Sequence, residues 1–320
     1  MAETSPETSG EGWERKVIEK VALAAIAEQR AARRWGILFK SLLLLYLFLL
    51  LFVGVGWMKK TDYRASGKHT ALVEMRGVID STGQASADNV TAGLQAAFKD
   101  ENTQGVVLRI NSPGGSPVQA GYINDEMRRL RGLHPNIPLY AVVEDICASG
   151  GYYVAVAADK IFVDKASIVG SIGVVMDGFG FTGTMEKLGV ERRALTAGEN
   201  KKFLDPFSPL LPAQKEYAEQ MLEEIHQQFI NVVRTGRGQR LKENPDTFSG
   251  LVWVGSKSIE LGLADALGSV DTVARDVVKA EDVVDFTVRE NIAERVARKF
   301  GATLAETFVR SAGQSATQLR

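Results

Sequence analysis

Apolar runs alternate with helix-like segments from Thr70 to about Arg289, and this alternation constrains the fold more than any other feature of the 320-residue chain. The runs are short, and the segments between them carry polar residues on their outer side, as crossover helices do. Strand, helix and strand in repeated succession favour a mainly parallel sheet joined by helical crossovers. The expected fold class is therefore α/β.

The expected elements form two sets. Strands are predicted at residues 71–79, 105–110, 139–143, 160–163, 248–254 and 283–288. Helices are predicted at residues 87–99, 117–131, 212–234, 256–261 and 270–279. Helix 212–234 has apolar residues four apart at Tyr217, Met221, Ile225 and Phe229. This spacing marks one buried face, which we interpret as core or subunit packing.

Ser149 is the candidate nucleophile. It lies between the apolar run 139–143 and the segment 150–157, which can begin a helix. A side chain at such a junction is exposed at the carboxyl edge of the sheet, and the first helical amides can face a developing negative charge. The glycine-rich stretch 111–116 follows another predicted strand and offers amides that can approach a substrate closely. Alone, a Ser-Gly-Gly sequence also fits tight packing of a helix on a sheet.

Composition excludes several other kinds of site. A formal net charge of -1 gives no reason to expect nucleic acid as a partner. Cys147 is the only cysteine, so neither an intrachain disulfide nor a cysteine-based metal cluster is expected. The three histidines are scattered without metal-ligand spacing and make poor triad candidates, with His69 expected in a linker and His134 in a turn. A lysine, Lys201, is therefore the better candidate base, and neither metal nor cofactor is expected.

The amino-terminal part predicts a membrane anchor. Residues 41–58 carry no charge, and starting from Trp35 the run is long enough to cross a bilayer. The expected organisation is a disordered and helical cytoplasmic tail (1–34), a transmembrane helix (35–58), a linker (59–69), a catalytic domain (70–289) and a carboxyl-terminal helix or tail (290–320). Basic residues flank the anchor on both sides, so charge does not decide its orientation. A short tail ahead of a first apolar segment usually stays inside, which places the catalytic domain outside the cytoplasm.

Several stretches, taken together in this order, resemble a known family. They are Arg109–Gly115, Ala148–Tyr153, Val169–Val174, Gly198 with Lys201, and Gly255 to Gly268. The chain resembles the membrane-anchored signal peptide peptidases of the Ser-Lys class, peptidase family S49, in their short single-domain bacterial form. The resemblance covers roughly residues 70 to 275 and implies a fold related to the caseinolytic protease subunit and to crotonase.

The resemblance also implies roles for single residues. Ser149 would be the nucleophile, Lys201 the general base, and Ser171 would hydrogen-bond the lysine amine, while the amides of Gly114 and Gly150 would form the oxyanion hole. Ring- or dome-shaped homo-oligomers are implied, in which Ser149 and Lys201 come from one chain or from two neighbours. A lysine accepts the serine proton only when its amine is neutral, which requires a pKa below about 10.4. Lys202, next in the chain, adds like charge and is an alternative base.

The expected substrates are remnant signal peptides, bound as an added strand, and misfolded membrane proteins are equally compatible. The expected location is the bacterial inner membrane. Two other functions compete with this one. A non-catalytic membrane scaffold would keep the fold for assembly alone, and a crotonase-type acyl-CoA enzyme would use the glycine amides without the Ser-Lys pair.

Overall fold

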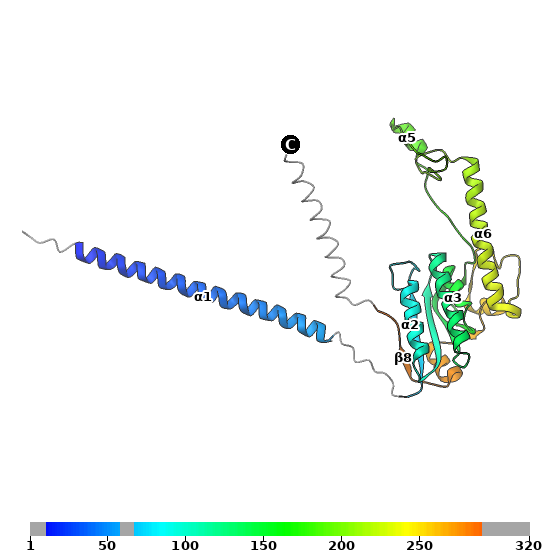
Figure 1. Ribbon diagram of the computed structural model, residues 1–320, viewed down its shortest axis with the longest axis horizontal. Helices are drawn as coiled ribbons and strands as arrows, with labels where there is room; N and C mark the ends of the chain where they lie inside the picture. The colour runs from blue at the N-terminus through cyan, green and yellow to red at the C-terminus, as the bar shows by residue number, and fades with distance from the viewer. Residues whose placement is uncertain (1–10, 58–66, 290–320) are drawn as a thin grey trace, which may run out of the picture. The chain divides into compact units, whose positions relative to one another are not determined.

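The computed structural model describes residues 11–57 and 67–289, and its contacts divide the chain into two units between Tyr63 and Arg64. The first unit holds one long helix, α1 (Glu11–Trp57) (Figure 1). The tail predicted to be partly disordered and partly helical over residues 1–34 is helical from Glu11 onward.

The predicted anchor, residues 35–58, falls on the second half of α1. Residue 58 and the side chains of residues 50–57 lie outside what the structure describes. Within the described residues, no helix combines the length and the apolar character required to cross a bilayer.

The second unit is built on an eight-stranded sheet. Its main path runs β6-β5-β3-β2-β1-β8, and β4 and β7 extend it from the first half of β3. All pairs are parallel except that of β5 with β6. The strands are β1 (His69–Arg76), β2 (Thr103–Ser112), β3 (Leu139–Ala148), β4 (Lys160–Val163), β5 (Ile168–Gly170), β6 (Val252–Val254), β7 (Ala266–Leu267) and β8 (Val283–Asp285). The predicted α/β class and mainly parallel sheet are confirmed.

Both faces of the sheet are covered, as expected for parallel strands. In β1, Ala71 and Val73 face the main core, whereas Leu72 joins a smaller cluster on the opposite face. The main core lies under α2 (Ala87–Lys99) and α3 (Pro117–Leu133), which pack side by side (Figure 1). The smaller cluster lies under α8 (Val270–Thr272) and the π-helix that follows, η2 (Val273–Val278).

Local sequence sets where these helices begin. The hydroxyl of Ser86 accepts a hydrogen bond from the amide of Asn89, and the hydroxyl of Ser116 accepts one from Gln119. Both satisfy a backbone donor that has no partner within the helix. Pro117 at the first position of α3 loses nothing, because its missing N–H would have been unpaired there.

The remaining helices lie between β3 and β7 in the chain. They are α4 (Gly150–Ala155), α5 (Thr182–Leu188), α6 (Pro212–Arg237), the 3-10 helix η1 (Gly238–Arg240) and α7 (Gly255–Glu260). Helix α5 was not predicted, and the strand expected at 248–254 is confined to β6 because residues 246–250 form turns. The single helix expected at 270–279 is divided between α8 and η2.

The segment from Val174 to Leu211, called the arm below, leaves the sheet after β5 and returns through α6. Figure 1 shows α5 at the end of α6 remote from the sheet. The arm has little core of its own, since α5 buries no residue. The rings of Phe181 and Phe207 are stacked with their centroids 5.4 Å apart. The ring of Phe203 lies edge-on to that of Tyr217 in α6, with 5.7 Å between the centroids.

Candidate active site

Ser149 occupies the junction between β3 and α4, at the carboxyl end of the strand. Its backbone has φ 52° and ψ −124°, a conformation that side-chain-bearing residues rarely adopt. Such a backbone costs on the order of 1–3 kcal/mol and is held only where the surroundings impose it. The amide of Ser149 donates to the carbonyl of Gly170 at 2.8 Å, which fixes the turn against β5. The position predicted for the nucleophile is therefore a strained one.

Glycines allow the close approach around this turn. Gly114 has φ +102°, and a Cβ there would lie 2.7 Å from the Cβ of Ser149 and 2.8 Å from the amide nitrogen of Gly150. Gly151 approaches the carbonyl of Ser112, which a Cβ would meet at 3.0 Å. A Cβ at Gly114 would therefore not fit between the ends of β2 and β3, and one at Gly151 would be tight.

The two predicted oxyanion amides lie close together at this point. Gly150 is the first residue of α4, so its amide has no partner within the helix. The amide of Gly114 donates to the hydroxyl of Ser112 at 3.1 Å. The Gly114 amide must therefore give up its hydrogen bond to Ser112 before it can donate one to an oxyanion, whereas the Gly150 amide has no such bond to give up within its helix.

Ser171 follows β5 directly and has the same positive φ as Ser149, 52°. Its amide donates to the carbonyl of Leu251 at 2.7 Å, which ties it to the residue before β6. A cavity of about 370 Å³ has Ser149, Gly150 and Ser171 on its wall. The structure thus brings three of the predicted site residues to one cavity.

The rest of that cavity is uncharged. Pro117 and Ala120 of α3, Tyr153 of α4, and Ile225 and Phe229 of α6 contribute to the wall. The Tyr153 and Phe229 rings are 5.2 Å apart, so α4 and α6 meet there. Burial raises the pKa of the Tyr153 hydroxyl, which keeps this side chain neutral.

Of the predicted site residues, Gly114 and Lys201 do not line the cavity of their own chain. Gly114 still lies against Ser149 and Gly150, whereas Lys201 lies elsewhere. It lies in a turn of the arm, where its amide donates to the carbonyl of Gly198 at 3.2 Å, and its side chain is exposed. The residues that line the cavity do not include it. Lys202, the alternative base, is half-buried in the same turn.

Comparison with known proteins identifies the family. The model of peptidase family S49 matches residues 132–284. A protein of Enterococcus faecium described as a candidate signal peptide peptidase, SppA, is 30% identical over 234 residues, which are 71% of this chain and 67% of the relative. The chain belongs to peptidase family S49. A candidate protease of Synechocystis is also 30% identical, over 67% of this chain and 73% of its own length.

A more similar relative of this S49 member carries other sequence as well. A protein of Brucella melitensis named Na(+)/H(+) antiporter NhaA is 43% identical over 213 residues, which are 65% of this chain. The chain spans about 29% of that relative's length. The resemblance to family S49 predicted from the motifs is confirmed.

The histidines of this S49 member take structural positions. His69 is not in a linker as predicted: it is the first residue of β1, is 1% exposed, and its Nδ1 lies 3.0 Å from the carbonyl oxygen of Gly67. Nε2 of His226 lies 3.1 Å from the carbonyl oxygen of Ile172. Among the described residues, no three His, Cys, Asp or Glu side chains lie close enough together to hold a metal ion.

The wall that α6 gives to this cavity was not predicted from the sequence. The four-residue apolar spacing predicted one buried face, but of its four residues only Phe229 is buried in the core, and Tyr217 is 62% exposed. Ile225 and Phe229 line the cavity. Tyr153 belonged to a recognised motif without a role. No signal in the sequence marks Ser249 or Gly250, which reach the cavity through the turn before β6.

Proposed function

We propose that this chain is a serine endopeptidase in which Ser149 is the nucleophile and Lys201 the general base. One observation carries the proposal: in a member of family S49, Ser149 sits on a strained strand-to-helix turn and faces a cavity beside Ser171 and the first amide of α4. Strained backbone of this kind is concentrated at functional sites.

The reaction follows from these groups. The neutral Lys201 amine takes the proton from Oγ of Ser149 as Oγ bonds to the carbonyl carbon of the peptide. The amides of Gly150 and Gly114 stabilise the oxyanion, and the Ser112 hydroxyl releases the Gly114 amide as they do so. The lysine returns the proton to the leaving amine, which leaves an acyl-enzyme. Water, deprotonated by the same lysine, then hydrolyses the ester, and Ser171 orients the amine by accepting one of its hydrogen bonds.

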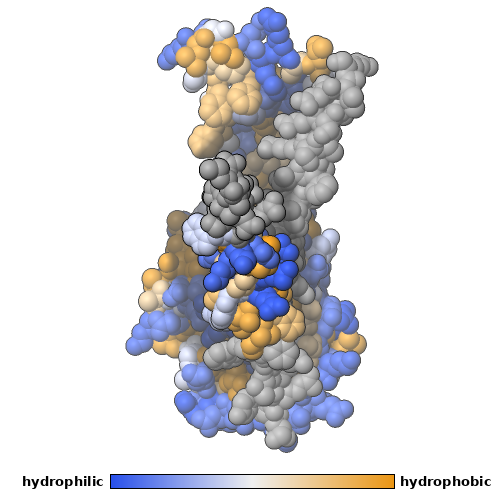
Figure 2. All heavy atoms as spheres, turned by 90° about the vertical axis from the view of Figure 1, so that its left-hand side faces the viewer, coloured by the Kyte–Doolittle hydropathy of each residue, from blue (hydrophilic) through white to orange (hydrophobic). Residues whose placement is uncertain are grey.

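The base comes from a neighbouring copy in this proposal. Lys201 lies in the arm, outside the cavity of its own chain, and the arm exposes large apolar side chains that a soluble monomer rarely leaves in water. They include Val175, Phe179, Leu188 and Leu195. Hydrophobic residues lie beside hydrophilic ones on the arm, at the top of the view in Figure 2. Docking of the arm onto the next copy in a ring or dome would cover these side chains and supply the lysine.

The substrates in this proposal are extended apolar peptides. No charged side chain lines the cavity, so burying a charged substrate residue there would cost several kcal/mol without a partner. Remnant signal peptides fit this requirement, and so do segments of misfolded membrane proteins. The uncharged run 41–58 supports a single membrane anchor. In this proposal the membrane is the bacterial inner membrane and the catalytic domain lies on its outer side, as the short tail ahead of the anchor favours.

The decisive experiment combines labelling with mixing. A fluorophosphonate probe should modify the wild-type protein at Ser149, and Ser149→Ala should abolish both labelling and hydrolysis of an apolar peptide ester. Lys201→Ala should do the same, whereas Lys202→Ala should retain activity. Mixing the inactive Ser149→Ala and Lys201→Ala proteins should restore part of the activity, because mixed assemblies contain sites with one intact copy of each group.

Each part of this experiment can contradict the proposal. Full activity of Lys201→Ala removes this lysine as the base. Mixed variants that stay inactive, while both still assemble, place the serine and the lysine in one chain. A wild-type protein that is neither labelled nor active supports a non-catalytic scaffold instead.

A further inference from the structure

The orientation of the Ser149 side chain depends on the position of α4, and this helix is too short to be stable without tertiary contacts. It has six residues, from Gly150 to Ala155. Isolated helices shorter than about 12 residues are marginal in water because nucleation is unfavourable. The position of the helix, and of the serine that precedes it, must therefore come from tertiary contacts.

Tyr152 provides a buried polar contact within α4 itself. Its side chain is 0% exposed, and its hydroxyl donates to the carbonyl oxygen of Leu263 at 2.8 Å. The two residues are 111 positions apart in the chain. Burial raises the pKa of the Tyr152 hydroxyl, so it stays protonated and remains a donor.

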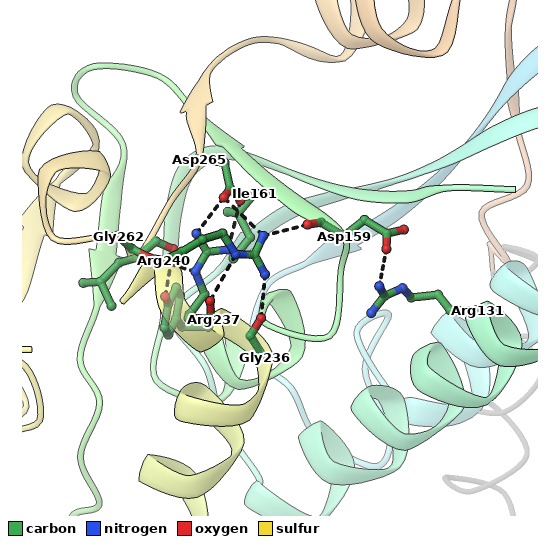
Figure 3. Close-up of polar contacts among 10 residues, drawn as sticks. Arg131, Asp159, Ile161, Gly236, Arg237, Arg240, Gly262 and Asp265 are labelled. Carbon is green, nitrogen blue, oxygen red and sulfur yellow. Dashed lines mark hydrogen bonds and ion pairs between the residues drawn. The ribbon is translucent and has the colours of Figure 1, made fainter. Parts of the chain in front are cut away.

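Arg237 holds the residues around Leu263, whose carbonyl receives this bond. The guanidinium of Arg237 donates from Nε to the carbonyl of Gly262 at 2.8 Å and pairs with both carboxylate oxygens of Asp265 at 2.9 Å (Figure 3). Two parallel bonds to a carboxylate fix direction as well as distance. The amide of Leu263 donates to the carbonyl of Ser258 at 2.8 Å. The acceptor of the Tyr152 hydroxyl is thus held on both sides.

The same charged cluster holds the chain where it leaves α4. Arg240 donates to the carbonyl of Asp159 at 2.8 Å and also reaches Asp265 (Figure 3). Arg131 of α3 pairs with the Asp159 carboxylate and donates to the carbonyl of Ala157 at 2.7 Å. The residues that follow α4 are therefore held in place by ion pairs and hydrogen bonds, while the strained backbone is at Ser149, just before the helix.

We infer that Tyr152 is a positioning residue for Ser149, acting through the hydrogen bond from its hydroxyl to the carbonyl of Leu263. The inference rests on the proposed role of Ser149 as nucleophile. Tyr152 follows Ser149 by three residues, so it lies within one helical turn of it. Without the bond, α4 can shift against the sheet, and Oγ of Ser149 leaves its line of attack. Displacements of about 1 Å cost on the order of a hundredfold in rate.

The test compares two variants that each lose a buried hydroxyl. Tyr152→Phe keeps the ring and removes only the bond to Leu263. Thr70→Val is the matched control, because the hydroxyl of Thr70 donates to the carbonyl of Ala280 at 2.7 Å and is equally buried, but lies at the amino-terminal end of β1. Both variants should lower the unfolding temperature by a few degrees.

Of these two variants, only Tyr152→Phe should slow the chemistry. We expect its kcat and its rate of fluorophosphonate labelling at Ser149 to fall by about tenfold with KM nearly unchanged, a partial loss on the scale given for misplaced groups. Thr70→Val should retain both rates. Arg240→Met, which loosens the exit of α4, should slow labelling in the same direction.

The outcomes separate the two proposals. A wild-type protein that is not labelled at Ser149 contradicts the proposed function itself. A labelled wild type, with Tyr152→Phe and Arg240→Met labelled equally fast, contradicts only the positioning role. Slower labelling of Thr70→Val to the same extent would reduce the effect of Tyr152 to general stability and also overturn the inference.

Discussion

The backbone amide of Ser149 donates a hydrogen bond to the carbonyl oxygen of Gly170 at 2.8 Å, and this bond joins the ends of β3 and β5. Because Ser171 follows Gly170, the two serines leave neighbouring strands side by side. Both have φ 52°. The sheet edge therefore holds two serines with positive φ on the wall of one cavity.

The strain at Ser149 predicts a difference between two inactive variants. Ser149→Ala keeps a Cβ at φ 52°, whereas Ser149→Gly removes it. Glycine tolerates this region at no steric cost, so Ser149→Gly should be more stable than Ser149→Ala by about 1 kcal/mol. Urea unfolding of both proteins measures the difference. A less stable glycine variant would show that the turn is not strained.

Gly114→Ala should disturb the site because its new methyl group would collide with Ser149. The new Cβ would lie 2.7 Å from that of Ser149, at a φ of +102°. We expect the free energy of unfolding to fall by at least about 2 kcal/mol and esterase activity to be lost. Gly121→Ala is the control, because nothing lies within 4 Å of its Cβ in α3. It should stabilise the protein by up to about 1 kcal/mol and retain activity. An active, stable Gly114→Ala protein would contradict the observed packing.

The exposed arm predicts a defect in assembly. Leu195 is 101% exposed and Phe179 is 78% exposed, so a glutamate at either position disturbs no core. Phe179→Glu and Leu195→Glu should therefore fold with unchanged thermal stability but assemble less, as sedimentation would show. Activity should fall with assembly and recover at higher protein concentration. Unchanged assembly in both variants would remove these side chains from the proposed contact between copies.

Asp265 predicts a pH dependence of stability. Burial opposes its ionisation, but the hydrogen bonds and charge of Arg237 outweigh burial, so the pKa of this carboxyl lies below its ordinary value. A depressed folded pKa stabilises the protein above the unfolded pKa, about 3.9, and this contribution is lost as the pH falls through the folded value.

The variant Asp265→Asn isolates that contribution. At pH 7 it leaves Arg237 buried without its counter-charge, which should cost about 3–5 kcal/mol. Urea unfolding at pH 7, 5 and 3 should show the gap between wild type and variant narrowing only below about pH 4. A gap of the same size at all three pH values would show that the ionised carboxylate contributes nothing.

The linear order of short apolar runs and one-sided helices was enough to predict the α/β class, the parallel sheet and the place of Ser149 at the end of a strand. These features follow from periodicity and from the unpaired amides at a helix start, which are local. Boundaries were less certain where tertiary contacts decide them. Residues 246–250 form turns although the residues that follow them continue as β6, and η2 widens to a π-helix within a segment that looks uniformly helical.

The sequence by itself determined the chemistry available to this protein: a serine between a strand and a helix, glycines beside it, and a lysine later in the chain. Only the tertiary structure decided which of these groups meet. The 2.8 Å bond between Ser149 and Gly170 and the bond from Tyr152 to Leu263, 111 residues away, join segments remote in the chain. No local pattern encodes such contacts, because each depends on which strands pair in the sheet and on how the helices and loops pack against it. The same packing leaves Lys201 on the arm, away from the cavity of its own chain.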